Sequence, residues 1–180
     1  FDDFKPYLIA TDDYGVTWRS ISSNLPNEPI NVVWEDAKNP DLLFEAWLAL
    51  PPAVREGTGL VFAGATESKY HEVDPALAGR IRADANRLGL LERVRLLGEV
   101  RGIERVYKAA DVLAMPSTRE AFGMVLVEAM ASGLPVIATR IAGVTDTIVD
   151  HGQTGLLVPA RDRDALAGGL ESLLADRSLA

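Results

Sequence analysis

The chain has 180 residues, 48% of them hydrophobic, which is enough to bury the core of one domain or of one domain plus a fragment. Its formal net charge of -8 argues against a protein that grips nucleic-acid backbones, and the lack of cysteine excludes disulfides and thiolate metal sites. We also expect no metal centre at His71 or His151, which are far apart in polar surroundings, and no signal peptide or membrane span.

Residues 1–44 differ in composition from the rest of the chain. They are rich in Asp, Asn, Ser and Thr and show no convincing helical period before Leu42, so we expect hairpins. The clearest turn signal is TDDYGVTW at 11–18, where Asp13 can accept hydrogen bonds from turn amides and Gly15 suits a positive φ. On turn chemistry alone, this segment can be an ordinary hairpin turn.

The same segment resembles the Asp-box of BNR or sialidase-like β-propellers. The pattern of that family, Ser/Thr-x-Asp-x-Gly-x-Thr-Trp, is matched by Thr11, Asp13, Gly15, Thr17 and Trp18. The resemblance implies a structural hairpin that closes one propeller blade, without a catalytic role. Because a propeller needs about four to eight blades and the sequence holds a single box, we expect a propeller fragment.

From about residue 57 onward, short apolar runs alternate with longer amphipathic ones, as in a parallel sheet covered by helices. The strongest helix signal is a stripe at helical spacing between Pro75 and Gly89, formed by Leu77, Ile81, Ala85 and Leu88. Strands are predicted over 60–64, 94–98, 112–116, 135–139 and 154–159. We therefore expect an α/β fold with a Rossmann-like open parallel sheet and helices on both faces, preceded by an N-terminal β-hairpin segment.

Two glutamates, Glu120 and Glu128, stand on either side of an apolar run that we expect to form a helix beginning near Gly123. Glu120 would then lie in the loop at the carboxyl end of a strand, where open α/β sheets bind ligands. The first amides of the helix suit an anion such as a diphosphate, and carboxylates suit hydroxyl groups of a sugar or ribose. Helix capping and a solvent-facing position also explain the two glutamates, so spacing alone does not decide for a ligand site.

Residues 120–139, EAFGMVLVEAMASGLPVIAT, resemble the E-x7-E segment of retaining glycosyltransferases with the GT-B fold, specifically family 4, the glycosyl transferases group 1. The segments before and after it, including RVRLLGEV and VYKAADVLAMPS, follow the order of that family over about residues 37–180. The resemblance implies the C-terminal, donor-binding domain of a GT-B enzyme. It implies transfer with retention from a UDP-, GDP- or ADP-sugar, without a metal or another cofactor.

The resemblance also assigns roles to individual residues. Glu120 would lie by the hydroxyls of the donor sugar, Glu128 would bind the ribose diol and Val100 would lie against the base. Lys38 would stabilise the leaving diphosphate. Backbone amides would come from Phe122, Gly123, Met124 and Val125.

The sequence departs from the family upstream of Lys38, where an arginine is expected and the chain has Val32 and Val33. The run KNPDLLF, 38–44, fits both resemblances. We therefore hypothesise a fusion, natural or an artefact of sequence assembly, of a propeller-like part at 1–37 and a donor-binding domain at 38–180, in which residues 30–34 can lend a first strand. The N-terminal Rossmann-like domain that a GT-B enzyme needs is missing, so we expect the chain alone to be inactive.

Two other functions stay open: a BNR or sialidase-like β-propeller protein fused to a foreign α/β segment, and a GT-B epimerase. Three other enzyme classes are disfavoured. A phosphorylase needs a lysine that binds pyridoxal phosphate, and we cannot place one. A dehydrogenase needs a G-x-G-x-x-G motif after a strand and a serine hydrolase needs G-x-S-x-G, and the sequence has neither. The resemblance implies a cytoplasmic protein whose intact relatives lie at the inner membrane surface. The base, the sugar and the acceptor are not determined by the sequence.

Overall fold

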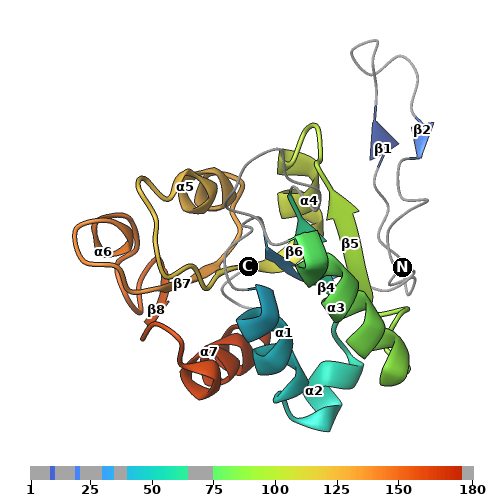
Figure 1. Ribbon diagram of the computed structural model, residues 1–180. Helices are drawn as coiled ribbons and strands as arrows, with labels where there is room; N and C mark the ends of the chain where they lie inside the picture. Colours follow the sequence, from blue (N-terminus) through green and yellow to red (C-terminus); the bar gives the residue numbers. More distant parts are fainter. Residues whose placement is uncertain (1–8, 11–18, 21–29, 35–39, 65–74, 176–180) are drawn as a thin grey trace.

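The computed structural model describes residues 9–10, 19–20, 30–34, 40–64 and 75–175 (Figure 1). Its strands are β1 (Ile9–Ala10), β2 (Arg19–Ser20), β3 (Ile30–Trp34), β4 (Leu60–Ala63), β5 (Val94–Gly98), β6 (Ala110–Met115), β7 (Val136–Thr139) and β8 (Gly155–Val158). Its helices are α1 (Pro40–Leu48), α2 (Pro52–Glu56), α3 (Pro75–Arg87), α4 (Glu104–Ala109), α5 (Met124–Ala131), α6 (Thr145–Ile148) and α7 (Arg163–Ala175). No helix in these ranges is both long and apolar enough to span a membrane.

The main sheet has six strands in the order β5-β4-β3-β6-β7-β8, and all neighbours in it are parallel. This confirms the predicted open parallel sheet. The segment expected to lend a first strand, 30–34, is β3, and Val32 pairs with Leu60 on one side and Val112 on the other. The strand order is that of doubly wound folds, with β3 beside β6 at the centre.

Helices cover both faces of this sheet, as predicted. Successive side chains of a strand point to opposite faces, so Leu60 and Phe62 join one core and Val61 joins the other. The first core includes residues of α1, α3 and α7, and the second includes residues of α4 and α5. In Figure 1, α1, α2, α3 and α7 lie below the sheet, and α4, α5 and α6 lie above it.

The helix predicted between Pro75 and Gly89 is α3, and Gly89 has the positive φ, 71°, that suits a helix end. Ile81 and Ala85 are buried, as the stripe requires. Leu88, which follows the last residue of α3, is 43% exposed.

The short strands β1 and β2 pair antiparallel to each other in a separate sheet. The Asp-box segment, 11–18, lies between them and outside the described residues, so the Asp-box hairpin stays a prediction. Lys38 and His71 also lie outside the described residues.

Candidate functional site

The candidate site lies at the carboxyl ends of β3 and β6, where the strand order changes direction. Ligands of open α/β sheets bind in the crevice outside such a point. After β6 the chain continues through the buried Pro116 and Ser117 into the loop that leads to α5. Because the start of this loop is anchored in the core, the residues that follow have a fixed place at the edge of the sheet.

Gly123 gives that loop its entry into α5. It precedes the helix in the left-handed conformation, with φ 64° and ψ 34°. A Cβ at this position would also come within 3.0 Å of Ile148 Cδ1. Both the backbone conformation and the space therefore call for glycine, which has no Cβ.

Glu120 folds back on its own loop. Its Oε1 accepts hydrogen bonds from the amides of Ala121, at 2.8 Å, and Phe122, at 3.2 Å. The carboxylate therefore lies beside the start of α5, as the sequence predicts. The Phe122 amide, predicted to bind the ligand, is engaged by Glu120 in this structure, so a ligand has to displace Glu120 to reach it.

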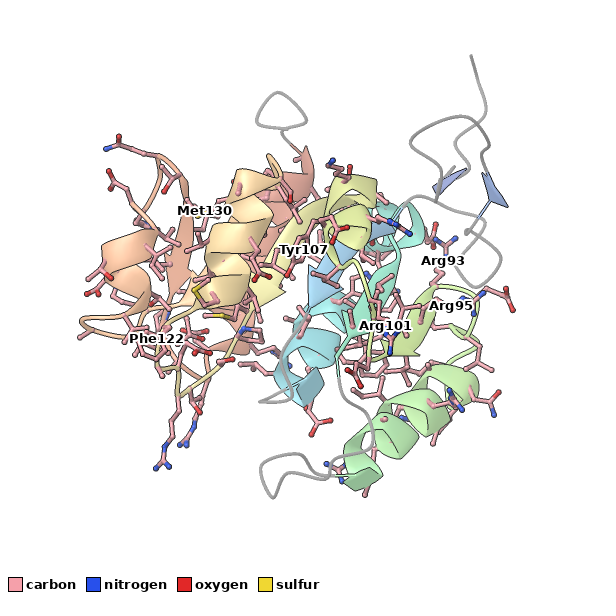
Figure 2. All side chains as sticks on the ribbon, turned by 90° about the horizontal axis from the view of Figure 1, so that it is seen from above. Arg93, Arg95, Arg101, Tyr107, Phe122 and Met130 are labelled. Carbon is pink, nitrogen blue, oxygen red and sulfur yellow. The ribbon has the colours of Figure 1, made fainter. Side chains whose placement is uncertain are left out.

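The first amides of α5 face away from the body of the helix and have no intrahelical acceptor. They belong to Gly123, Met124 and Val125, and the amide of Leu126 donates to the Gly123 carbonyl at 3.0 Å. Phe122 is 77% exposed and Met124 57% exposed, and Figure 2 shows Phe122 at the outer end of this loop. Gly123, which lies between these two exposed residues, is itself buried.

Glu128 is exposed on α5, four residues after Met124, so the two side chains share one stripe of the helix. Val100 follows β5, on the other side of β3, and packs against the second core. Glu120 thus lies beside the start of α5, Glu128 lies one turn further along this helix, and Val100 lies on the other side of the central strands. Because Lys38 lies outside the described residues, its predicted role stays untested.

The loop after β7 contains hydrogen bonds that the sequence did not indicate. The buried hydroxyl of Thr145 donates to the Thr139 carbonyl at 2.7 Å and accepts from the Ile141 amide at 2.7 Å. Asp146 Oδ1 accepts from the Gly143 amide at 2.7 Å. These hydrogen bonds stabilise the conformation of the loop and attach it to the end of β7. The sequence feature from which these hydrogen bonds could have been expected is the group of polar residues directly after a buried strand.

One side chain near the end of β8 has a shifted pKa. Asp164, through a side-chain hydrogen bond and its negative charge, raises the pKa of the exposed Arg163 guanidinium. Within the described ranges, no group of three His, Asp or Glu residues could hold a metal ion.

Comparisons with known proteins agree with this geometry. The sequence profile of the family described as Glycosyl transferases group 1 matches residues 33–180. The D-inositol 3-phosphate glycosyltransferase of Corynebacterium diphtheriae is 47% identical over 91 residues, which cover 49% of this chain and 21% of that protein. The D-inositol 3-phosphate glycosyltransferase of Jonesia denitrificans is 36% identical over 185 residues, which cover 98% of this chain and 42% of that protein.

Among solved structures, HepE from Anabaena, determined in complex with UDP and glucose, superposes with a TM-score of 0.71 at 29% sequence identity. The superposition covers 84% of this chain and 40% of HepE. The chain thus spans less than half the length of each of these relatives. On the match over residues 33–180 and the strand order observed here, the chain belongs to the glycosyl transferases group 1 family.

Proposed function

We propose that the chain is the donor-binding part of a retaining glycosyltransferase, which takes a sugar from a nucleoside diphosphate sugar. One observation carries the proposal: Glu120, the left-handed Gly123 and the start of α5 lie together at the carboxyl edge of β6. Family membership supports it, as does the UDP and glucose bound to the related HepE.

The geometry suggests how the parts act. The amides at the start of α5 compensate the charge of the diphosphate, helped by the partial positive charge of the helix terminus. Glu120 accepts a hydrogen bond from a hydroxyl of the sugar. As its carboxylate turns toward the sugar, it releases the Phe122 amide, which can then bind the ligand. Glu128 accepts hydrogen bonds from the ribose hydroxyls, and Val100 contacts the base. Lys38 compensates the charge that builds up on the diphosphate as its bond to the sugar breaks.

The full transfer reaction is part of the same proposal. The acceptor oxygen forms the new bond on the face of the sugar from which the diphosphate leaves, and no metal takes part. In the intact enzyme a second Rossmann-like domain holds the acceptor, and the reaction takes place in the cytoplasm, at the inner membrane surface.

Calorimetric titration of the chain with UDP, GDP and ADP tests the donor site. We expect one of these nucleotides to bind, and Glu128→Ala to weaken its binding about tenfold or more, because charged hydrogen bonds contribute about 1.5–3 kcal/mol. Glu171→Ala is the matched control. It removes an exposed glutamate of α7 instead of α5, so the affinity for the nucleotide should not change. A folded chain that binds none of the three nucleotides contradicts the proposal.

The Asp-box resemblance at 11–18 favours a second proposal, in which a propeller-like segment is fused to the transferase domain near residues 38–44. The alignment with the Jonesia enzyme speaks against it, because it runs over nearly the whole chain and leaves little room for a foreign segment. Sequencing the source DNA across residues 30–50 decides between the two: a junction there supports the fusion, and an uninterrupted transferase reading frame upstream excludes it.

A further inference from the structure

The short helix α6 packs against the start of α5. Its last residue, Ile148, is partly buried against the second core. A Cβ on Gly123 would lie 3.0 Å from Ile148 Cδ1 and 3.9 Å from Glu120 Cγ. Figure 1 shows α5 and α6 beside each other on the same face of the sheet. The side of Gly123 that lacks a side chain therefore faces both α6 and the glutamate of the candidate site.

Thr145, the first residue of α6, attaches this helix to the sheet. Its side chain is fully buried, and its hydroxyl donates to the Thr139 carbonyl at the end of β7 at 2.7 Å. The same hydroxyl accepts from the Ile141 amide at 2.7 Å. A hydroxyl can donate and accept at once, so this single group joins the strand, the loop and the helix.

The position of Ile148 depends on that of Thr145, because α6 is only four residues long. The Thr145 carbonyl accepts a hydrogen bond from the amide of Val149 at 2.9 Å, and Val149 is buried. Ile148 directly precedes Val149, so it is carried on one helical turn that is anchored at both ends. Loss of the Thr145 hydroxyl would therefore loosen the place of Ile148 beside Gly123.

Gly123 needs such support because glycine adopts positive and negative φ about equally well. Its left-handed conformation, with φ 64° and ψ 34°, must therefore be selected by its surroundings. The hydrogen bond from the Leu126 amide to the Gly123 carbonyl, 3.0 Å long, restrains it from within α5. Ile148 restrains it from α6. These restraints determine where the first amides of α5 point.

We infer that Thr145 is a positioning residue of the donor site. Its hydroxyl holds α6 on the sheet, and α6, through Ile148, holds Gly123 so that the first amides of α5 are aligned for the diphosphate. Thr145 is fully buried, so it acts through this packing and does not touch the ligand. The inference deepens the proposed function and rests on it.

Calorimetric titration with the nucleotide that the unaltered chain binds best, among UDP, GDP and ADP, tests the inference. Thr145→Val keeps the shape of the side chain and removes both hydrogen bonds, whereas Thr145→Ser retains the hydroxyl. We expect the valine variant to weaken binding about threefold to tenfold, the range that one neutral hydrogen bond covers. The serine variant should bind like the unaltered chain.

Amide nuclear magnetic resonance of the free chain gives a second readout that needs no ligand. The signals of Gly123 and Met124 should shift in Thr145→Val and stay in place in Thr145→Ser. A loss of affinity without these shifts would contradict the inference, because the effect would then not pass through the start of α5.

Thr58→Val is the matched control for a loss of stability. Thr58 is also buried, and its hydroxyl also accepts one hydrogen bond and donates another. It precedes β4, so it lies at the edge of the parallel sheet opposite to the candidate site. Measured at a temperature where every variant is folded, Thr58→Val should leave the nucleotide affinity unchanged.

Ile148→Val keeps the test decisive if Thr145→Val fails to fold. It removes the Cδ1 atom that approaches Gly123 and leaves the hydrogen bonds of Thr145 in place. It should weaken nucleotide binding and shift the signals of Gly123 and Met124. Ile81→Val removes the same atom from a buried isoleucine of α3 in the first core, and it should do neither.

Two results of the titrations overturn the inference: Thr145→Val binds the nucleotide as tightly as the unaltered chain, or it loses no more affinity than Thr58→Val. Failure of the donor site would look different. If no nucleotide binds the unaltered chain, the donor proposal falls, and the signals of Gly123 and Met124 then decide by themselves whether Thr145 positions the start of α5.

Discussion

The indole Nε1 of Trp47 donates a 3.0 Å hydrogen bond to the hydroxyl of Thr58, and both side chains are buried. The bond joins α1 to the residue two positions before β4, and the same hydroxyl donates to the Arg55 carbonyl at 3.2 Å. Thr58→Val keeps the shape of the side chain and leaves the buried indole N–H without this acceptor. We expect the free energy of unfolding to fall by about 1–3 kcal/mol.

Urea unfolding followed by circular dichroism measures this loss. Thr58→Ser is the matched control, because it retains the hydroxyl and removes only a methyl group. If the valine variant is as stable as the serine variant, the hydrogen bond between Trp47 and Thr58 contributes nothing to the fold.

Gly155 is the first residue of β8, which pairs with β7. It stands opposite Val136, and a Cβ on it would come within 2.6 Å of Val136 Cγ2 and 2.7 Å of the Val136 carbonyl oxygen. Because one of these atoms is backbone, a side-chain rotation cannot relieve the contact. We expect Gly155→Ala to lower the free energy of unfolding by about 1–3 kcal/mol, as overpacking does elsewhere. Thermal unfolding measures the change.

Gly168 provides the opposite case in the same part of the chain. It lies inside α7, and a Cβ there would meet nothing within 4 Å. Gly168→Ala should raise stability by about 0.5–1 kcal/mol, since alanine restricts the unfolded chain and favours the helix. If Gly155→Ala melts no lower than the unaltered chain, the contacts of Gly155 do not control the β7 and β8 pairing; a fall in the melting temperature of Gly168→Ala would contradict the expectation for α7.

The sheet was predictable because β4 and β7 are buried along their whole length, and the chain marks such strands with unbroken apolar runs. The helix ends at Gly89 and Gly133 were predictable for a related reason, since both glycines adopt the positive φ that such ends need. The short helix α2 buries no residue and gave no apolar period from which to predict it.

The candidate site was predictable where it depends on one local segment, as for Glu120 and Gly123. The place of Val100 on the other side of β3 from Glu120 was not, because it depends on the strand order of the sheet. The hydrogen bonds from the Ala121 and Phe122 amides to Glu120 could not be predicted either, because a glutamate before a helix can cap the helix or bind a ligand.

Gly123→Ala tests whether the conformation of the α5 start is needed for the donor site. The alanine would have to adopt a φ of 64° and place its Cβ 3.0 Å from Ile148 Cδ1. We expect a loss of about 1–2 kcal/mol in stability, because the left-handed conformation is costly for a residue with a Cβ. The first amides of α5 should also shift, so UDP affinity, measured by calorimetry, should fall together with stability.

Gly133→Ala separates the two effects at the other end of the same helix. Gly133 has a φ of 80°, and a Cβ there would meet nothing within 4 Å. The control therefore carries a similar backbone cost but leaves the start of α5 in place, so we expect lower stability with unchanged UDP affinity. If both variants lose UDP affinity equally, binding follows the overall stability of α5, and the geometry of Gly123 has no special part in holding the diphosphate.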